Sequence, residues 1–293
     1  MPEELTVCLN GKFVPTSQAM VNVYDHGLLY GDGCFEGIRA YNKKVFKLDE
    51  HVARMYRSAE KIGLTPPISA KEFRELILET CRRNKVSDAY IRPVFTRGVG
   101  ELGISAKTCK SPSVIIIVKP VDPAVKKPEE KALRLITSKY VRTPPQSLNP
   151  NVKSLNYLNN ILAKMEAEQK GVEEALLLDK DGYVSEASAM NVFIIKNGAL
   201  VTPTTETVLE GITRGTLIEL AKQRKYNVSE AKFRLDDVYS ADEMFLTGTL
   251  AELVPVIELD GKKIGDGKPG KITTELMRAF SEYARSAGAE IYK

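Results

Sequence analysis

A lysine stands directly before an apolar, helix-like run in the middle of the chain, at Lys153 in NVKSLNYLNN. The run predicts a helix that begins near Ser154, with the lysine at its N-terminus. Its apolar positions are Leu155, Leu158, Ile161, Leu162 and Met165. A cation there opposes the helix dipole, which favours the neutral amine. A neutral lysine can attack an aldehyde and form a Schiff base; an ordinary surface lysine is the alternative.

Two further side chains suit the same chemistry. Tyr157 lies four residues after Lys153, so on a helix both side chains would share a face and reach one ligand. Glu186 lies among small residues in GYVSEASAMN, which leaves room for a flat ligand. A carboxylate facing a protonated ring nitrogen makes a charge-assisted hydrogen bond, and a pyridoxal ring withdraws electrons only while that nitrogen is protonated. An exposed glutamate is the alternative.

Two turns and one arginine could bind a phosphate group. Gly211-Ile212-Thr213-Arg214 opens a predicted helix, and Thr247-Gly248-Thr249 follows an apolar strand, so both offer backbone N–H groups. Arg54 flanks the apolar stripe of a helix predicted over 49–62. Simple capping by Thr213 and a solvated arginine are the alternatives. Together the three features favour a small molecule that carries a phosphate.

GDGKPG at 265–270 matches the glycine pattern G-x-G-x-x-G, which in a strand–turn–helix unit binds dinucleotides. Here it follows a hairpin near the C-terminus and contains Pro269. We therefore do not predict a dinucleotide site.

A phenol and a guanidinium alternate in the strand-like AYIRPVF, at Tyr90 and Arg92. In a strand both side chains point to the same face. The pair suits a polar substrate group, and a polar outer face of a sheet is the alternative.

The elements that position these residues fall into two predicted domains. Residues 1–120 form a small α+β domain, with helices over 49–62 and 70–84. VDPAVKKPEEK at 121–131 has the prolines and charges of a linker. Residues 132–293 form a larger domain that contains the helix after Lys153, several hairpins and a C-terminal helix.

The composition excludes several classes of protein. The chain has 293 residues, a net charge of +4 and no basic run, which argues against nucleic acid as a partner. No apolar stretch is long enough to span a membrane, and no secretion signal is visible. Two histidines and four scattered cysteines predict neither a metal site nor disulfides. We predict a cytoplasmic protein.

The chain resembles the fold-type IV, or class IV, pyridoxal-phosphate-dependent aminotransferases, and most closely the branched-chain amino-acid aminotransferases. The resemblance runs almost end to end, through YDHGLLYGDGCFEGIRAY, LDEHVARMYRSAEKIG, AYIRPVFTRGVGELG, NVKSLNYLNNILAKMEA, GYVSEASAMNVFIIKNG, GITR, FLTGTLAELVPV and DGKKIGDGKPG. It implies the D-amino-acid-aminotransferase-like fold, whose larger C-terminal domain is a pseudo-barrel. It also implies amino-group transfer between leucine, isoleucine or valine and 2-oxoglutarate, which yields 2-oxo acids and L-glutamate.

The resemblance implies a role for each matching position. Lys153 would form the Schiff base with pyridoxal 5'-phosphate and shuttle the proton, Glu186 would pair with the pyridine nitrogen, and Tyr157 would bond the 3-oxygen. The phosphate would be held by Arg54, Ile212, Thr213 and Thr249. The substrate pocket would be lined by Tyr30, Phe35, Gly37, Tyr90 and Arg92. The family implies a homodimer, or a larger oligomer of dimers, in which the loop over 97–103 reaches into the partner's site.

Two departures leave the substrate range open. Ala187-Ser188-Ala189-Met190 stands where the family commonly has Gly-Ser-Gly and an acidic residue. Leu250 stands where a small alanine is common, in a turn whose N–H groups would receive the substrate carboxylate. The alternatives are a D-amino-acid aminotransferase, an aminodeoxychorismate-type lyase, and a non-catalytic binder of a phosphorylated ligand.

Overall fold

The structure is a computed structural model that describes residues 4–122, 130 and 132–292. The chain divides into two compact units. The first comprises Met1–Pro123, Val152–Asn156 and Ala284–Lys293, and the second comprises Ala124–Asn151 and Tyr157–Tyr283. Most of the predicted linker over 121–131 lies outside the described residues. The predicted domains 1–120 and 132–293 stay a prediction.

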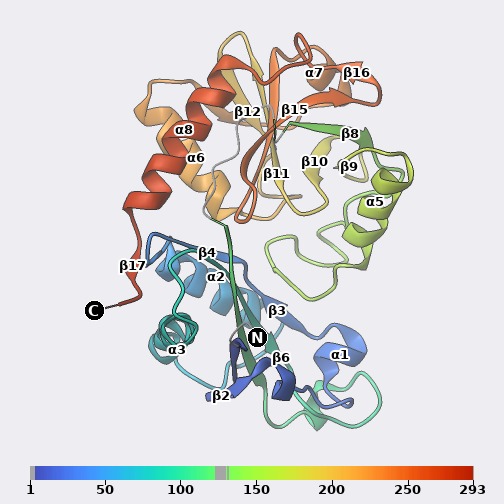
Figure 1. Cartoon of the computed structure of the whole chain (residues 1–293). Helices are drawn as coiled ribbons and strands as arrows, with labels where there is room; N and C mark the ends of the chain where they lie inside the picture. The colour runs from blue at the N-terminus through green and yellow to red at the C-terminus, as the bar shows by residue number, and fades with distance from the viewer. Residues whose placement is uncertain (1–3, 123–129, 131, 293) are drawn as a thin grey trace. The chain divides into compact units, whose positions relative to one another are not determined.

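The first unit is built on an antiparallel sheet (Figure 1). Its strands are β1 (Thr6–Leu9), β2 (Lys12–Pro15), β3 (Gly33–Phe35), β4 (Ile38–Tyr41), β5 (Lys44–Val45), β6 (Ala89–Thr96), β7 (Ser113–Pro120) and β17 (Ala289–Glu290). The strand order is β17-β5-β4-β6-β7-β1-β2, and β3 pairs with β6. Two hairpins of this sheet turn at Asn10-Gly11 and Asn42-Lys43, where φ is positive.

Helices of the first unit bury their predicted stripes against this sheet. They are α1 (His26–Tyr30), α2 (Leu48–Lys61) and α3 (Ala70–Arg83), with the 3₁₀ turns η1 (Thr16–Gln18) and η2 (Ala106–Thr108). In α2, Val52, Met55 and Ala59 join the core. A capping box between Ser69 and Glu72 starts α3. Both long helices lie within two residues of their predicted bounds.

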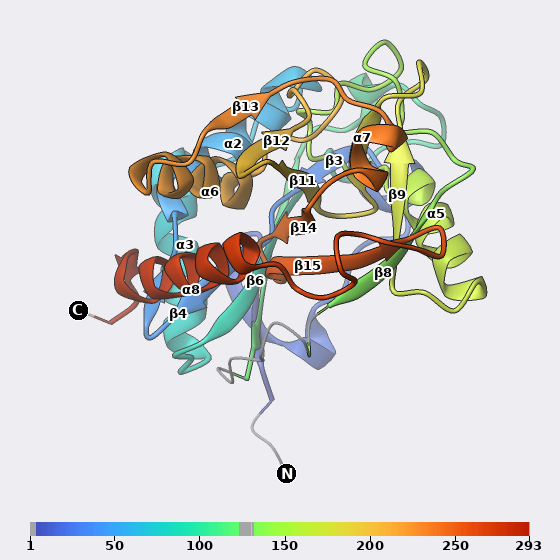
Figure 2. The same ribbon diagram turned by 90° about the horizontal axis from the view of Figure 1, so that it is seen from above.

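The second unit is built on a mixed sheet that curls as a half-barrel (Figure 2). Its strands are β8 (Leu133–Thr137), β9 (Glu174–Leu178), β10 (Val184–Ala187), β11 (Asn191–Lys196), β12 (Ala199–Thr202), β13 (Val228–Glu230), β14 (Glu243–Gly248), β15 (Glu252–Leu259) and β16 (Lys262–Lys263). The order is β10-β9-β8-β15-β14-β11-β12-β13, and β16 pairs with β15. This two-sheet α+β architecture confirms the predicted fold class.

The helices of the second unit include α6 and α8 on one side of the sheet and α5 beside β8 and β9 (Figures 1 and 2). Their bounds are α5 (Leu158–Gln169), α6 (Ile212–Gln223), α7 (Leu235–Tyr239) and α8 (Lys271–Ser286), whose last turn runs into the first unit. Within the described part of the chain, no helix is long and apolar enough to cross a membrane.

One predicted helix begins four residues late and buries another face than expected. We predicted a start near Ser154, but α5 begins at Leu158. The predicted stripe is largely exposed, with Leu158, Ile161 and Met165 at 67%, 49% and 46% of their surface. The helix instead buries Asn160, Ala163 and Ala167. Small side chains face the sheet here because they allow close packing, so the large apolar ones face outward.

The glycine pattern at 265–270 leads into α8, but the helix N-terminus is already occupied. The carboxylate of Glu243 accepts hydrogen bonds from the backbone N–H groups of Ile272 at 3.0 Å and Thr273 at 2.7 Å. A side-chain carboxylate therefore fills the position that a ligand phosphate would take, in agreement with the rejection of a dinucleotide site.

Candidate active site

Lys153 lies in an extended segment that pairs with β3, not at a helix N-terminus as we predicted. The Phe35 N–H donates to the Lys153 carbonyl at 2.9 Å, and the Leu155 N–H donates to the Gly33 carbonyl at 3.0 Å. The Lys153 N–H donates to the buried hydroxyl of Ser58 on α2 at 3.2 Å. Because α5 starts five residues later, the helix dipole does not act on this amine and Tyr157 does not share a helix face with it.

The ring of Phe35 connects the lysine with the predicted substrate residues. The Lys153 ammonium nitrogen lies 4.8 Å from the ring centre, and the guanidinium carbon of Arg92 lies 4.5 Å from it. Phe35 is buried at the end of β3. The Phe35 ring therefore contacts the Lys153 side chain and the Arg92 guanidinium together.

Tyr90 and Arg92 point to one face of β6, as predicted. The Tyr90 hydroxyl oxygen accepts hydrogen bonds from Arg92 Nη2 at 2.6 Å and Nε at 3.2 Å. Gly37 lies directly under this pair, because a Cβ at that position would be 2.5 Å from the Tyr90 hydroxyl. The first unit thus brings together Lys153, Phe35 and the polar pair with the glycine that leaves room for it.

Tyr30, the remaining predicted substrate residue of this unit, lies at the end of α1 and holds a loop. Its hydroxyl accepts a hydrogen bond from the Gly103 N–H at 2.8 Å. The same loop is held by His26, whose Nε2 lies 2.9 Å from the Glu101 carbonyl oxygen. The structure therefore joins Tyr30 to the loop over 97–103 that we predicted to reach a partner subunit.

Arg54 is 5% exposed on α2 and forms an ion pair that the sequence did not predict. Its Nε and Nη2 donate to the two carboxylate oxygens of Glu36 at 2.6 and 2.8 Å. Nδ1 of His51 lies 2.8 Å from Glu36 Oε2. Burial opposes the charge of Glu36, but attraction to Arg54 and then His51 outweighs it and holds the pKa of Glu36 well below its usual range. Burial, the largest influence, lowers the pKa of His51.

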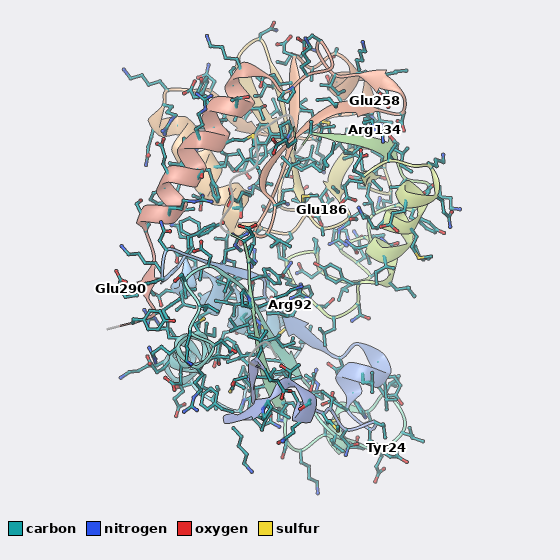
Figure 3. The ribbon with its side chains drawn as sticks, in the orientation of Figure 1. Tyr24, Arg92, Arg134, Glu186, Glu258 and Glu290 are labelled. Carbon is teal, nitrogen blue, oxygen red and sulfur yellow. The ribbon has the colours of Figure 1, made fainter. Side chains whose placement is uncertain are left out.

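Glu186 lies in β10 of the second unit and is 6% exposed (Figure 3). Its Oε1 accepts from Arg142 Nε at 2.7 Å. Its Oε2 accepts from Asn191 Nδ2 at 3.1 Å and from the Leu209 N–H at 3.2 Å. Three donors orient the carboxylate as an acceptor, and a protonated ring nitrogen would be one more donor.

The predicted phosphate residues of the second unit surround two features that fit an anion. Helix α6 begins at Ile212, followed by the buried Thr213, and its N-cap Gly211 supplies no side-chain cap. Thr247, at the end of β14, has a buried hydroxyl without a hydrogen-bond partner among the described residues. Uncapped N–H groups and an unpaired hydroxyl suit a phosphate group.

The other predicted residues of this unit have less specific surroundings. Thr249 and the 56% exposed Leu250 form the turn after β14. Tyr157 is the N-cap of α5.

The residues present fit a flat, phosphorylated aldehyde such as pyridoxal phosphate, because the chain offers an amine, an oriented carboxylate and uncapped N–H groups.

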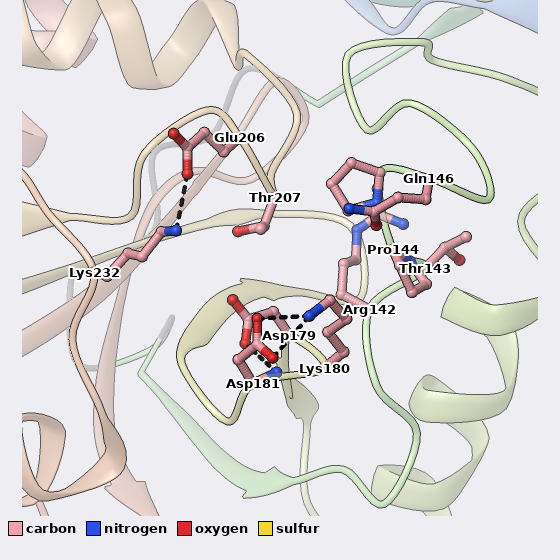
Figure 4. A pocket seen from close by; sticks show the side chains of 11 residues that line it. Arg142, Thr143, Pro144, Gln146, Asp179, Lys180, Asp181, Glu206, Thr207 and Lys232 are labelled. Carbon is pink, nitrogen blue, oxygen red and sulfur yellow. Dashed lines mark hydrogen bonds and ion pairs between the residues drawn. The ribbon is translucent and has the colours of Figure 1, made fainter.

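A cavity of about 400 Å³ in the second unit does not contain the candidate site (Figure 4). Its lining includes Arg142, Asp181, Glu206 and Lys232, and none of the predicted site residues. Its charged groups largely pair with each other, as Lys232 does with Glu206 at 3.0 Å.

The sequence analysis missed Glu36, His51, Ser58, Arg142 and Asn191. Charged or polar residues that interrupt an apolar stripe were the available signal. His51 and Arg54 follow the buried face of α2, one turn apart, and Glu36 lies between buried residues in CFEGI. The sequence alone does not show which of these groups meet.

Comparison with known proteins identifies the family of this chain. Residues 33–259 match the family model for amino-transferase class IV. A protein of Methanocaldococcus jannaschii, provisionally named a branched-chain-amino-acid aminotransferase, is 47% identical over 98% of this chain and 99% of its own length. A D-alanine aminotransferase of Bacillus licheniformis is 33% identical over 98% of this chain and 99% of its own length.

Solved structures match as well. The branched-chain amino acid aminotransferase of a Thermus bacterium, complexed with N-(5'-phosphopyridoxyl)-L-glutamate, has a TM-score of 0.93 and 37% identity over 97% of this chain and 95% of that one. The same enzyme is also known complexed with 4-methylvaleric acid. A family model that spans most of the chain and relatives that align with it end to end show the family: the chain is a class IV aminotransferase.

Proposed function

We propose that this protein is a branched-chain amino-acid aminotransferase that uses pyridoxal 5'-phosphate. It transfers the amino group of L-leucine, L-isoleucine or L-valine to 2-oxoglutarate, which gives the branched-chain 2-oxo acid and L-glutamate. The observation that carries the proposal is the position of Lys153 beside the Phe35 ring, with the Tyr90–Arg92 pair at the same ring. An amine, an apolar wall and a carboxylate-binding pair are what this reaction needs. The Thermus relative, which binds both a glutamate adduct and an apolar acid, supports the proposal.

Lys153 is the proposed catalytic residue. When bound, pyridoxal phosphate supplies an aldehyde that condenses with amines and a protonated ring that withdraws electrons from the substrate Cα. The Lys153 amine would hold the cofactor and would give way to the substrate amine. It then removes the proton from the substrate Cα as general base and returns it as general acid. The backbone hydrogen bonds of Lys153 to Phe35 and Ser58 fix the segment that carries this amine.

The other roles follow the family resemblance and are part of the proposal. Glu186 pairs with the ring nitrogen, and Tyr157 bonds the 3-oxygen. The phosphate is held by Arg54, Ile212, Thr213 and Thr249, and Tyr30, Gly37 and Leu250 border the substrate with the residues named above.

The proposal also explains how one pocket accepts two different side chains. A branched aliphatic side chain packs on the apolar wall of Phe35. The distal carboxylate of glutamate or 2-oxoglutarate binds Arg92, whose planar guanidinium suits a carboxylate. Arg92 is partly exposed, so it is accessible to such a ligand.

The decisive experiment is an absorbance spectrum of the purified protein with pyridoxal phosphate, before and after borohydride, followed by peptide mapping. We expect a yellow band that bleaches and leaves a pyridoxyl group on Lys153. Lys164, on α5, is the internal comparison, because it is a neighbouring lysine outside the proposed site. A colourless protein, or label on another lysine, would contradict the proposal. A panel of L- and D-amino acids then separates the branched-chain assignment from a D-amino-acid aminotransferase, and a test with aminodeoxychorismate excludes or identifies the lyase.

The proposed assembly is a homodimer. The segments 20–30 and 97–104 form one surface, the apolar lobe, joined by the bridge between Asp25 and Val99 and by the Tyr30–Gly103 hydrogen bond. Its exposed apolar side chains are Met20, Val21, Val23, Tyr24, Leu28, Leu29, Tyr30, Val99, Leu102 and Ile104. Exposed apolar side chains gathered on two joined segments suit an interaction site, and a second copy of this chain is the occupant that the family resemblance implies.

The proposed location is the cytoplasm. The four cysteines are free thiols, and Cys8, Cys34 and Cys81 are buried. Free thiols of this kind are typical of proteins in a reducing compartment.

A further inference from the structure

The carboxylate of Glu36 meets Arg54 and His51 in a buried cluster of the first unit. Glu36 is fully buried, and both its oxygens bind the Nε edge of the Arg54 guanidinium. A two-point contact fixes the plane of a guanidinium, which a single contact does not. His51 Nδ1, 2.8 Å from Oε2, restrains the carboxylate in turn.

The protonation states of Glu36 and His51 fix which groups of the cluster donate hydrogen bonds and which accept them. Because the pKa of Glu36 is held low, the carboxylate is charged and accepts hydrogen bonds only. Burial lowers the pKa of His51 although the neighbouring carboxylate opposes this, so the ring is neutral near pH 7. A neutral ring facing a carboxylate donates from Nδ1. The charge of Arg54 is thus balanced within the cluster, and the cluster contributes the orientation of the guanidinium.

The same elements hold the reactive lysine. Glu36 follows Phe35, whose N–H binds the Lys153 carbonyl, and Arg54 lies one turn before Ser58, whose hydroxyl accepts from the Lys153 N–H. The cluster and the lysine segment are therefore anchored at the same end of β3 and on the same helix α2.

We propose that Glu36 is a positioning residue that holds Arg54, with His51 as second anchor, in the orientation that binds the cofactor phosphate. This inference rests on the proposed function, which assigns Arg54 to that phosphate. A purely structural role would not need ionic groups, because well-packed apolar residues stabilise a core at least as well as a buried ion pair.

The test compares the affinities of the full-length protein, freed of cofactor, for pyridoxal phosphate and for pyridoxal, which lacks the phosphate. Glu36→Gln removes the charge, and loss of one partner of a buried ion pair is strongly destabilising. Glu36→Asp is the second variant: it keeps the charge but shortens the side chain by one methylene, so it cannot maintain the contacts to both Arg54 and His51. Glu79→Gln is the matched control, because it removes a glutamate paired with Arg82 and Arg83 at the surface of α3.

We expect Glu36→Asp to raise the Kd for pyridoxal phosphate by about 10- to 100-fold, the range typical of residues that orient a ligand-binding side chain, and to leave the Kd for pyridoxal unchanged. Glu79→Gln keeps both wild-type values. Wild-type preference for the phosphorylated ligand in Glu36→Asp, or equal losses for both ligands, would overturn the inference. Borohydride labelling of Lys153 in the wild-type protein is read separately, so the proposed function stands or falls independently of the Glu36 variants.

Discussion

The hydroxyl of Tyr90 and the guanidinium of Arg92 form a fixed pair, with Nη2 2.6 Å and Nε 3.2 Å from the hydroxyl oxygen. The same guanidinium lies 4.5 Å from the Phe35 ring. The guanidinium of Arg92 is therefore held by an aromatic ring and by hydrogen bonds to a hydroxyl. We infer that Arg92 is positioned to recognise the second carboxylate of the dicarboxylic substrate. It has no such role for the aliphatic substrate.

Arg92→Ala should lower kcat/KM for 2-oxoglutarate far more than for leucine. Loss of a charge-assisted contact to one substrate costs about 1.5–3 kcal/mol, or roughly 10- to 100-fold in kcat/KM. The measurement is each half-reaction followed by cofactor absorbance. Arg134→Ala is the matched control, because Arg134 pairs with Glu173 on the surface of the second unit. Equal losses for both substrates would contradict the assignment.

Gly37→Ala should weaken the binding of 2-oxoglutarate without altering Lys153. The added Cβ would lie 2.5 Å from the Tyr90 hydroxyl, so the phenol must move and its bonds to Arg92 are lost. We expect KM for 2-oxoglutarate to rise about 10-fold, the equivalent of ~1.4 kcal/mol. Gly215→Ala on α6 is the control, since a Cβ there meets no atom within 4 Å. A KM that is unchanged in Gly37→Ala would show that Tyr90 is not part of the pocket.

Acid stability should depend on His51. Burial lowers the pKa of His51 from its ordinary value of 6.5, so the unfolded chain binds the proton more readily. The free energy of unfolding therefore falls as the pH drops below 6.5, by at most about 1.4 kcal/mol per pH unit for one group. His51→Gln should flatten this dependence between about pH 6.5 and 5, measured by urea unfolding at several pH values.

The stabilising charge of Glu36 is affected at lower pH. Its pKa lies below the ordinary value of 4.5, so its contribution is complete above pH 4.5 and is lost as the pH falls further. Glu79→Gln is a control for the histidine experiment, because the pKa of Glu79 is also lowered from 4.5, chiefly by the hydrogen bond from Arg82. Glu79→Gln should keep the wild-type pH dependence of the free energy of unfolding between pH 6.5 and 5. If His51→Gln also kept that dependence, His51 would be excluded as the titrating group.

Carboxylates placed on the apolar lobe should dissociate the proposed dimer. Leu102 and Ile104 are 73% and 88% exposed. A double variant Leu102→Glu/Ile104→Glu places two like charges in the interface of each subunit, and we expect monomers in sedimentation velocity at micromolar concentration. Lys107→Glu, in the same loop, adds a carboxylate without removing an apolar group and should stay dimeric. A monomeric wild-type protein would refute the assembly outright.

Local signals in the sequence predicted the long helices of the first unit. The apolar stripe of Val52, Met55 and Ala59 is a short-range feature that survives in the fold. The capping box of Ser69 and Glu72 is a second local signal, which the prediction did not use. The same reasoning failed at Lys153, because pairing with β3, more than a hundred residues earlier, overrides the apolar periodicity after it. A periodic pattern also does not reveal whether its apolar face is covered by the same chain, which is why the exposed side of α5 was predicted as core.

The site shows the same limit. Lys153, Tyr90 and Arg92 were selected as chemically useful types. The structure brings Lys153 and Arg92 to the Phe35 ring and bonds Tyr90 to Arg92. Glu36 was not selected, because a carboxylate in an apolar stretch gives no indication of its partner. Its partner Arg54 lies 18 residues away on another element. Pairs of this kind follow from tertiary packing and not from local sequence.

The short segment Val152–Asn156 returns to the first unit in the middle of the chain that builds the second. The polypeptide therefore crosses between the units several times, and the C-terminal strand β17 crosses once more to pair with β5. Neither unit is a cassette that can be cut out or exchanged by a single recombination event. A fragment that ends near residue 123 would lack the segment Val152–Asn156, which carries Lys153 and pairs with β3, so the first unit is incomplete in such a fragment.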